Sequence, residues 1–259
     1  MNKQKFKAAC EKIINIERVQ RPAMERARDG ISGAAGSIGT LGEKTLHAVV
    51  KHYLEPDETR HEIRLGSSVA DIINENGVFE IQTRGFYNLK KKLEKFLEIS
   101  PVTVVYPLSK TRWIAWINEE TGEVSRKTRS PKKGKIQDAV LELYRIREFL
   151  SHPNFRLLIL FIDMEEYRYL DGWSKDKKRG STRCDRIPVD VNGEVYFNSP
   201  ADYSMLLPDG LPERFTSKDY KKEAGVILSI AQTALNILNS LGVVRRVEKQ
   251  GNLLIYERE

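Results

Sequence analysis

The sequence has few of the features that mark secreted, disulfide-bonded or membrane-spanning proteins. Its two cysteines, Cys10 and Cys184, lie far apart, which excludes a disulfide framework and the spacing of a zinc site. His47 and His52 do not share a helix face, so histidine adds no metal-binding cluster. No apolar run approaches the roughly 18 residues of a membrane span, and the lysine-rich start lacks the apolar segment of a secretory signal. These absences predict a cytoplasmic protein with no membrane partner.

Positive charge is in excess. Lysine and arginine number 43 against 36 aspartates and glutamates, which gives a net charge of +7 and favours polyanionic partners. Hydrophobic residues make up 40% of the 259 residues, enough for a core in one large domain or two modest ones. The oligomeric state is left open, a homodimer included.

One hairpin is the strongest candidate for a functional site. Two β-rich runs are joined by Asn74-Glu75-Asn76-Gly77, and Asn-Gly in that setting is a strong hairpin signal. A loop of Asn76-Gly77 places Asp71 opposite Gln82, whereas a loop of all four residues places Asp71 opposite Glu80. In both registers Asp71, Glu80 and Gln82 share one face of the hairpin.

Two carboxylates at cross-strand distance can share one divalent cation, and an isolated buried carboxylate needs such a partner. The alternative is that Asp71 and Glu80 lie on the solvated face of an edge hairpin. A third acid, Glu43, falls on the apolar face of the predicted helix 43–54. It either answers the helix dipole, which is the commoner case, or points toward the hairpin.

The remaining pattern alternates helices with apolar strands, which predicts an α/β (α+β) fold with a mixed central sheet flanked by helices. A glycine-rich segment, 30–42, is expected to be a flexible loop. The further predicted helices are 3–29 (with a break at Pro22), 86–97 and 136–150. The predicted strands are 62–65, 101–108 and 155–164, together with hairpins over 110–129 and 188–197, the latter turning at Asn192-Gly193.

Residues 213–259 predict a small second domain. Thr216 or Ser217 caps a helix over 218–224, a second helix spans 228–241, and a hairpin of 243–247 and 253–256 follows. This order resembles winged-helix DNA-binding domains, which also serve as protein–protein modules. Side chains expected to contact DNA are Gln232, Thr233 and Asn236 on the second helix and Arg245 and Arg246 on the wing.

A basic loop is predicted over 174–186. It is either a solvated surface loop or a segment that contacts phosphates without reading sequence. The cations expected to make such contacts are Lys175, Lys177, Lys178, Arg179 and Arg183.

The stretch 42–164 resembles the PD-(D/E)XK nuclease superfamily, and most closely its Holliday-junction-resolvase-like and restriction-endonuclease-like members. The resemblance is carried by Gly42-Glu43, a helix, Val69-Ala70-Asp71-Ile72, and Phe79-Glu80-Ile81-Gln82-Thr83 before the next helix. It implies that Asp71 and Glu80 bind Mg²⁺ or Mn²⁺ and that Glu43 supports the metal site.

Gln82 stands where that family usually has lysine, and glutamine supplies no positive charge, although it can orient a water. Lys90 or Lys91 on the following helix is a candidate replacement. Two hypotheses follow: a metal-dependent DNA endonuclease with a winged-helix targeting domain, or a catalytically weakened nuclease-like binding or regulatory protein. The predicted organisation is 1–41 (N-terminal helix and loop), 42–164 (nuclease-like core), 165–212 (basic connector) and 213–259 (winged helix).

Overall fold

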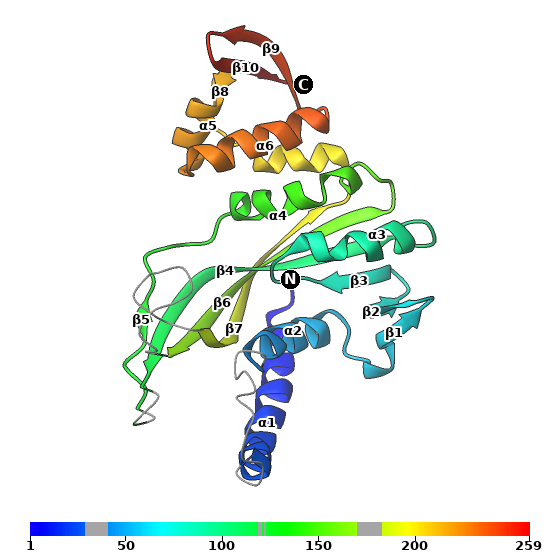
Figure 1. Cartoon of the computed structure of the whole chain (residues 1–259), viewed down its shortest axis with the longest axis vertical. Helices are drawn as coiled ribbons and strands as arrows, with labels where there is room; N and C mark the ends of the chain where they lie inside the picture. Colours follow the sequence, from blue (N-terminus) through cyan, green and yellow to red (C-terminus); the bar gives the residue numbers. More distant parts are fainter. Residues whose placement is uncertain (29–40, 119–120, 122, 170–182) are drawn as a thin grey trace. The chain divides into compact units, whose positions relative to one another are not determined.

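The computed structural model of the chain describes residues 1–28, 41–118, 121, 123–169 and 183–259, with the side chains of 16–28 and 41–44 left out. A large mixed sheet flanked by helices forms its centre, which confirms the general fold class predicted from the sequence (Figure 1). In the part of the chain that is described, no helix has the length and apolar character needed to cross a membrane.

The chain forms two compact units, each made of three segments. The first unit contains Met1–His61, Pro107–Gly134 and Leu160–Gly193. The second contains Glu62–Tyr106, Lys135–Ile159 and Glu194–Glu259, so the candidate hairpin and the C-terminal elements belong to the same unit.

Among the described residues the large sheet has seven strands in the order β1-β2-β3-β4-β6-β7, with β5 paired to β4. β2 and β3 are antiparallel, whereas β3 and β4 are parallel, so the sheet is mixed. The strands are β1 (His61–Leu65), β2 (Ser68–Asn74), β3 (Gly77–Ile81), β4 (Val102–Ile117), β5 (Thr128–Arg129), β6 (Phe155–Tyr169) and β7 (Arg183–Phe197).

The hairpin of β2 and β3 turns at Glu75-Asn76, because Asn74 pairs with Gly77 and Ile72 with Phe79. This register places Asp71 opposite Glu80, as in the second of the two predicted registers. Gly77 is required here, since its φ is +107° and an added Cβ would lie 2.3 Å from the carbonyl oxygen of Pro101.

The helix that follows β3 begins as a 3₁₀ turn, η3 (Phe86–Leu89), and continues as α3 (Lys90–Phe96). Leu89, Leu93 and Phe96 are buried on one stripe, as the periodicity predicts. α3 connects β3 to the parallel strand β4, and its N-terminal side is anchored by Glu142, which accepts hydrogen bonds from the backbone N–H groups of Gly85 and Phe86.

The other predicted helices are present with changed limits. α1 (Lys3–Arg28) and α2 (Leu41–Leu54) belong to the first unit, and α1 passes Pro22 without ending, so the break expected there was wrong. The helix predicted over 136–150 is a succession of η4 (Ile136–Ala139), α4 (Val140–Arg145) and η5 (Arg147–Phe149).

The hairpin predicted over 110–129 is present, because Trp113 pairs with Arg129 and Ile117 with Val124, but its first arm and the strand 101–108 are one continuous strand, β4. One other strand prediction was wrong. The hairpin expected over 188–197 is part of the continuous strand β7, and Asn192-Gly193 is not a turn. An added Cβ at Gly193 would lie 3.5 Å from the Phe161 ring, an ordinary van der Waals distance, so packing against Phe161 does not require glycine at this position.

The C-terminal elements agree with their predicted order. After η6 (Pro200–Leu206) come β8 (Arg214–Thr216), α5 (Ser217–Ala224), α6 (Leu228–Ser240), β9 (Val244–Gln250) and β10 (Leu253–Arg258). Thr216 caps α5 by accepting hydrogen bonds from the N–H groups of Lys218 and Asp219. The three strands pair in the order β8-β10-β9, and α6 packs against both α5 and α4.

Candidate active site

Asp71 and Glu80 lie opposite one another on β2 and β3. Asp71 Oδ2 accepts a hydrogen bond of 2.7 Å from the backbone N–H of Ile81, and the Glu80 carboxylate accepts one from the backbone N–H of Asp71. Glu80 is only 2% exposed, whereas Asp71 is half-buried. The carboxylates therefore form a partly desolvated acid pair, and the solvated-face alternative does not hold for Glu80.

The electrostatics of the pair follow from this burial. Desolvation and the neighbouring charge of Asp71 raise the pKa of Glu80 to about 7, although Lys92 opposes the increase. A carboxyl group with such a pKa changes its protonation state near neutral pH. A cation placed beside this carboxyl group would lower its pKa, because positive charge favours the ionised form.

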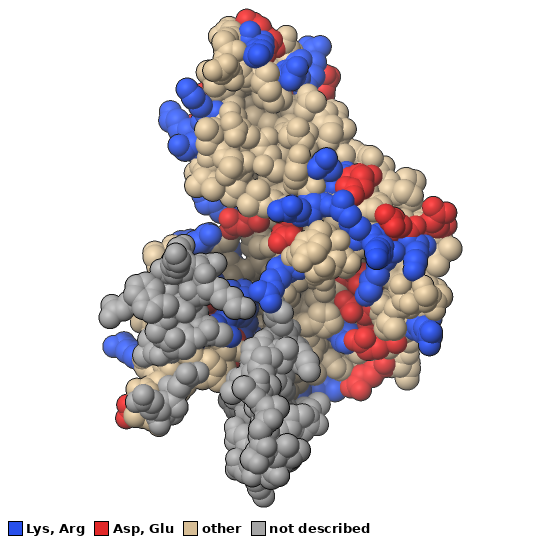
Figure 2. All heavy atoms as spheres, in the orientation of Figure 1, with Lys and Arg blue, Asp and Glu red and all other residues tan. Residues whose placement is uncertain are grey.

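Lys92 on α3 supplies one positive charge to the pair. Its Nζ lies 2.8 Å from Glu80 Oε2 and 3.1 Å from Oε1, and its side chain is 32% exposed. The lysine expected here was Lys90 or Lys91. Lys90 instead pairs with Glu148, and Lys91 is exposed. Figure 2 shows blue Lys and Arg side chains at the surface in the region of α3.

The helical periodicity of the sequence could have identified Lys92. It lies three residues after Leu89 and four before Phe96, both buried, so it belongs to the inward stripe of the helix. Lys91 is one position off that stripe.

Gln82 does not join the acid pair. Gln82 Nε2 donates to the backbone carbonyls of Arg84 and Gly85, so this side chain braces the turn after β3. Glu43 is in α2 of the first unit, and its side chain lies outside the description, so its predicted role stays a prediction.

The described residues contain no group of three or more His, Cys, Asp and Glu side chains arranged to hold a metal ion. Two carboxylates are nevertheless a usual protein contribution to a Mg²⁺ site, because this ion keeps several waters and takes further oxygens from substrate phosphates. Asp71 and Glu80 fit that pattern, and burial together with the charge of Asp71 raises the pKa of Glu80, so a bound cation would favour its ionised form.

The residues expected to contact DNA on α6 and the wing lie largely at the surface. Gln232 and Asn236 are exposed, whereas Thr233 is half-buried and donates to the carbonyl of Ser229. On the wing, Arg246 is exposed, but Arg245 Nη2 lies 3.0 Å from Glu257 Oε2. The charge of Arg245 is thus partly balanced within the wing.

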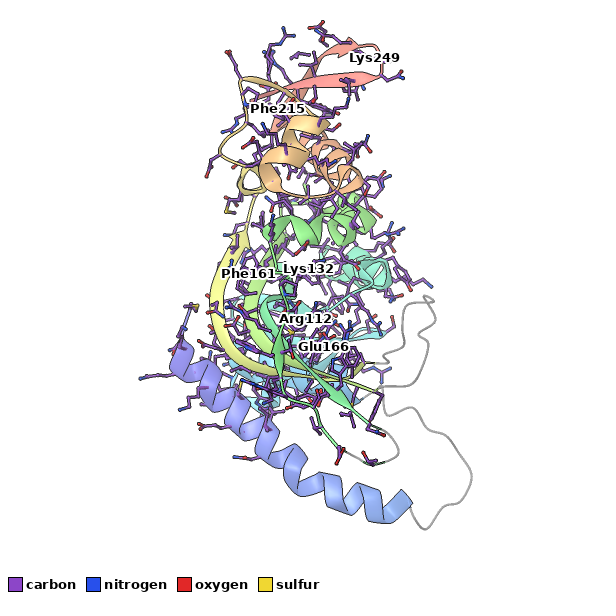
Figure 3. All side chains as sticks on the ribbon, turned by 90° about the vertical axis from the view of Figure 1, so that its left-hand side faces the viewer. Arg112, Lys132, Phe161, Glu166, Phe215 and Lys249 are labelled. Carbon is purple, nitrogen blue, oxygen red and sulfur yellow. The ribbon has the colours of Figure 1, made fainter. Side chains whose placement is uncertain are left out.

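Two further cations of the C-terminal sheet also differ in exposure and pairing. Lys249 is exposed at the end of β9, next to the turn of the hairpin (Figure 3). Arg214 on β8 is paired with Glu248.

The basic loop predicted over 174–186 is described only from Arg183 onward. Lys175, Lys177, Lys178 and Arg179 lie outside the described residues. Arg183 was expected in a surface loop, but it begins strand β7 and its Nε lies 3.7 Å from the buried carboxylate of Glu166. That part of the loop prediction was wrong, because the strand extends further toward its N-terminal end than the sequence indicated.

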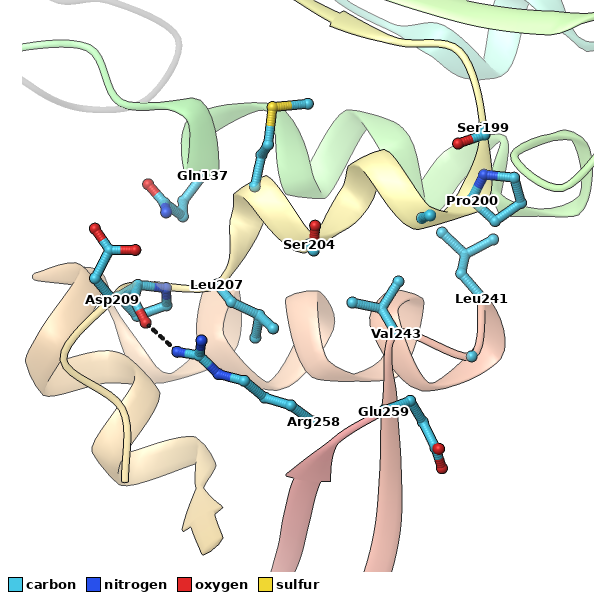
Figure 4. Close-up of a pocket in the computed structure, with 14 residues that line it drawn as sticks. Gln137, Ser199, Pro200, Ser204, Leu207, Asp209, Leu241, Val243, Arg258 and Glu259 are labelled. Carbon is cyan, nitrogen blue, oxygen red and sulfur yellow. Dashed lines mark hydrogen bonds between the residues drawn. The ribbon is translucent and has the colours of Figure 1, made fainter. Parts of the chain in front are cut away.

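A groove of about 1190 Å³ lies elsewhere in the second unit, between η6 and the C-terminal ends of α6 and β10 (Figure 4). Ser204, Leu207 and Val243 line it, and Arg258 donates a hydrogen bond of 3.0 Å to the carbonyl of Pro208. None of the predicted site residues line this groove, so the acid pair and the groove are separate features.

Comparison with known proteins identifies the family. Residues 44–198, more than half of the chain, match the family described as Domain of unknown function (DUF8091). The chain belongs to the DUF8091 family. The DUF8091 region contains the acid pair and Lys92 and ends before the C-terminal elements.

A protein of Treponema pallidum (strain Nichols), described as an uncharacterized protein, is 29% identical over 224 residues. The alignment covers 86% of this chain and 88% of the relative, so the similarity extends beyond the DUF8091 match. No solved structure matches the chain.

Proposed function

We propose that this protein is a metal-dependent DNA endonuclease whose reaction is centred on Asp71, Glu80 and Lys92. The observation that carries the proposal is the acid pair on adjacent strands with a lysine ammonium 2.8 Å from Glu80. Two acids and one lysine at the end of a hairpin form the set of groups that the PD-(D/E)XK resemblance implies. Lys92 here takes the part that Gln82 cannot fill.

The local topology supports the same assignment. β2 and β3 form an antiparallel hairpin, and α3 then connects β3 to the parallel neighbour β4. The hairpin holds both acids on one face, and the crossover helix brings Lys92 to that face. The three groups are thus fixed by regular elements rather than by loops, as a preorganised site requires.

Each group has a distinct task in phosphodiester hydrolysis. Asp71 and Glu80 would hold Mg²⁺ or Mn²⁺, and the ion when bound supplies charge neutralisation at the phosphate and a more acidic water. Lys92 lowers the pKa of Glu80 and so favours its ionised form, and its ammonium group can also orient a water or a phosphate oxygen. Gln82 acts by bracing the turn that leads from β3 to α3.

The C-terminal elements are proposed to target the enzyme to DNA as a winged helix. The element order β8-α5-α6-β9-β10 and the strand order β8-β10-β9 support this assignment. Gln232 and Asn236 offer amides on the exposed face of α6, and Arg246 and Lys249 offer charge on the wing. Because α6 also packs against α4, only its polar stripe is available to a groove of DNA.

One observation favours the alternative of a binding protein without catalysis. Both oxygens of Glu80 accept hydrogen bonds from Lys92, and this ion pair compensates a buried carboxylate without any metal. In that case the fold would bind DNA or regulate a partner, and the acid pair would serve stability.

Metal binding separates the two functions. Calorimetric titration of the full chain with Mn²⁺ should show one site, and Asp71→Asn should abolish it while the protein stays folded by circular dichroism. Lys91→Gln is the matched control, since Lys91 is an exposed lysine of the same helix. If wild type and Asp71→Asn take up Mn²⁺ equally, the binding-protein alternative is correct.

A further inference from the structure

A run of positive charge accompanies strand β5 in the first unit. Residues 126–133 include five lysines and arginines and no acid. Lys127 is neutralised, because its Nζ lies 2.6 Å from Glu165 Oε1. The other four cations are exposed, and none of them forms an ion pair with a described residue. They are Arg126, Arg129, Lys132 and Lys133, and we call them the basic strip.

The backbone that carries the basic strip is fastened to β4. The N–H of Ser130 donates a hydrogen bond of 2.7 Å to the carbonyl of Arg112, and the N–H of Gly134 donates one of 3.2 Å to the carbonyl of Lys110. The chain approaches β4 so closely at Gly134 that an added Cβ would lie 2.1 Å from the carbonyl oxygen of Ser109. The cations of the strip therefore project from a backbone that is held in place rather than from a loose loop.

Two acids near the basic strip do not neutralise it. Glu165 pairs with Lys127 and accepts a hydrogen bond of 3.0 Å from the hydroxyl of Tyr167. Glu123 lies beside the turn of the hairpin, six residues before Arg129. An extended chain rises about 3.3 Å per residue, so roughly 20 Å separate the backbones of these two residues, which is more than the screening length of about 8 to 10 Å.

Protection of a sheet edge does not account for the whole strip. Within the described part of the chain β5 pairs only with β4, so it is an edge strand, and such strands carry lysine to prevent pairing with another chain. Lys132 (labelled in Figure 3) and Lys133 lie beyond the strand, where this purpose does not apply. Like charges gathered in a short segment repel one another, and a polyanion removes that repulsion.

The dimensions of the basic strip suit the backbone of a nucleic acid. An extended segment from residue 126 to residue 133 spans about 23 Å. One strand of a DNA duplex carries a phosphate about every 3.4 Å along the helix axis, so the strip can follow roughly seven consecutive phosphates. Arginine and lysine side chains contact such phosphates without reading the bases, and the exposed positions of these four leave them accessible.

We propose that the basic strip is a contact surface for the phosphate backbone of duplex DNA. The inference rests on the proposed function for the identity of the partner, but not for the chemistry, because no residue of the strip belongs to the acid pair and the contact requires no metal. Each phosphate contact releases counterions, so each cation of the strip should add about 0.9 to the slope of log affinity against log salt concentration.

The test is fluorescence-anisotropy titration of a short labelled DNA duplex with the full-length protein, in buffer containing a chelator, between about 50 and 200 mM salt. The double variant Arg129→Gln/Lys132→Gln should lower the slope by about 1.8 and weaken binding at least about tenfold at the lowest salt concentration. Lys7→Gln/Lys91→Gln is the matched control: it removes the same charge from two exposed lysines outside the strip and should leave the slope unchanged. Arg129→Lys/Lys132→Arg keeps the charge and should bind as wild type does.

The outcomes separate this inference from the proposed nuclease activity. Equal slopes for the two glutamine double variants overturn the role of the strip, whatever the protein does to DNA. DNA binding whose slope depends on the strip supports the inference even if no metal-dependent cleavage is found. Absence of DNA binding by wild type overturns it. Vesicles that contain phosphatidylserine are the second probe: loss of vesicle binding in Arg129→Gln/Lys132→Gln, without an effect on DNA binding, would assign the strip to a membrane surface and overturn the proposal.

Discussion

The raised pKa of Glu80 gives the sharpest quantitative prediction, made with Glu80→Gln. In the folded state the pKa is about 7, against an ordinary value of 4.5 in the unfolded chain. Between these values the folded protein binds more protons than the unfolded one, so stability should fall as the pH rises. The difference between the two pKa values corresponds to a loss of at most about 3 kcal/mol of unfolding free energy between about pH 5 and pH 8.

Glutamine keeps the shape of the side chain and removes the titration. We therefore expect Glu80→Gln to lack this part of the pH dependence, so that the difference in unfolding free energy between wild type and variant shifts in favour of the variant as the pH rises. Equilibrium urea unfolding at a series of pH values measures the difference, and ¹³C NMR of the Glu80 carboxyl group gives its pKa directly. A difference that is constant with pH, or a Glu80 pKa near 4.5, would refute the reasoning.

Three other predictions concern local structure. Gly77→Ala should destabilise the protein by about 1–3 kcal/mol, because φ is +107° and the new Cβ meets the carbonyl oxygen of Pro101; an unchanged urea midpoint would contradict this. Thr216→Ala should cost about 1 kcal/mol through the lost helix cap, whereas Thr216→Ser should cost little. Burial raises the pKa of the Cys10 thiol to about 12, so Cys184 should react first with a thiol reagent in the native protein; equal rates would be inconsistent with this burial.

The acid pair could be predicted from the sequence because it depends only on whether the hairpin loop has an even number of residues. Both even loop lengths place Asp71 and Glu80 on one face, so the prediction did not depend on which of the two loops is formed. The lysine was assigned one or two residues too early. Lys90 and Lys91 are the first two lysines of the helix, whereas the buried stripe of α3 identifies Lys92.

Local signals failed where tertiary packing overrides them. Asn192-Gly193 is typical of a turn, but β7 continues through both residues as a strand of the large sheet. The ion pairs of Glu166 with Arg112, Arg168, Arg183 and Arg186 were also missed, since these arginines come from three strands and only the fold brings them to Glu166. Arg183 in particular could be interpreted only as part of a basic loop until the start of β7 was known.

DNA cleavage in the presence of Mg²⁺ or Mn²⁺ tests the central claim most directly. Supercoiled plasmid, single-stranded and branched DNA should be incubated with wild type, Asp71→Asn, Lys92→Gln and the control Lys91→Gln. We expect wild type and Lys91→Gln to cut at least one of these substrates, and Asp71→Asn and Lys92→Gln to lose at least about 100-fold in rate. Absence of cleavage by wild type on all three substrates, or cleavage that survives Asp71→Asn, would contradict the proposed endonuclease.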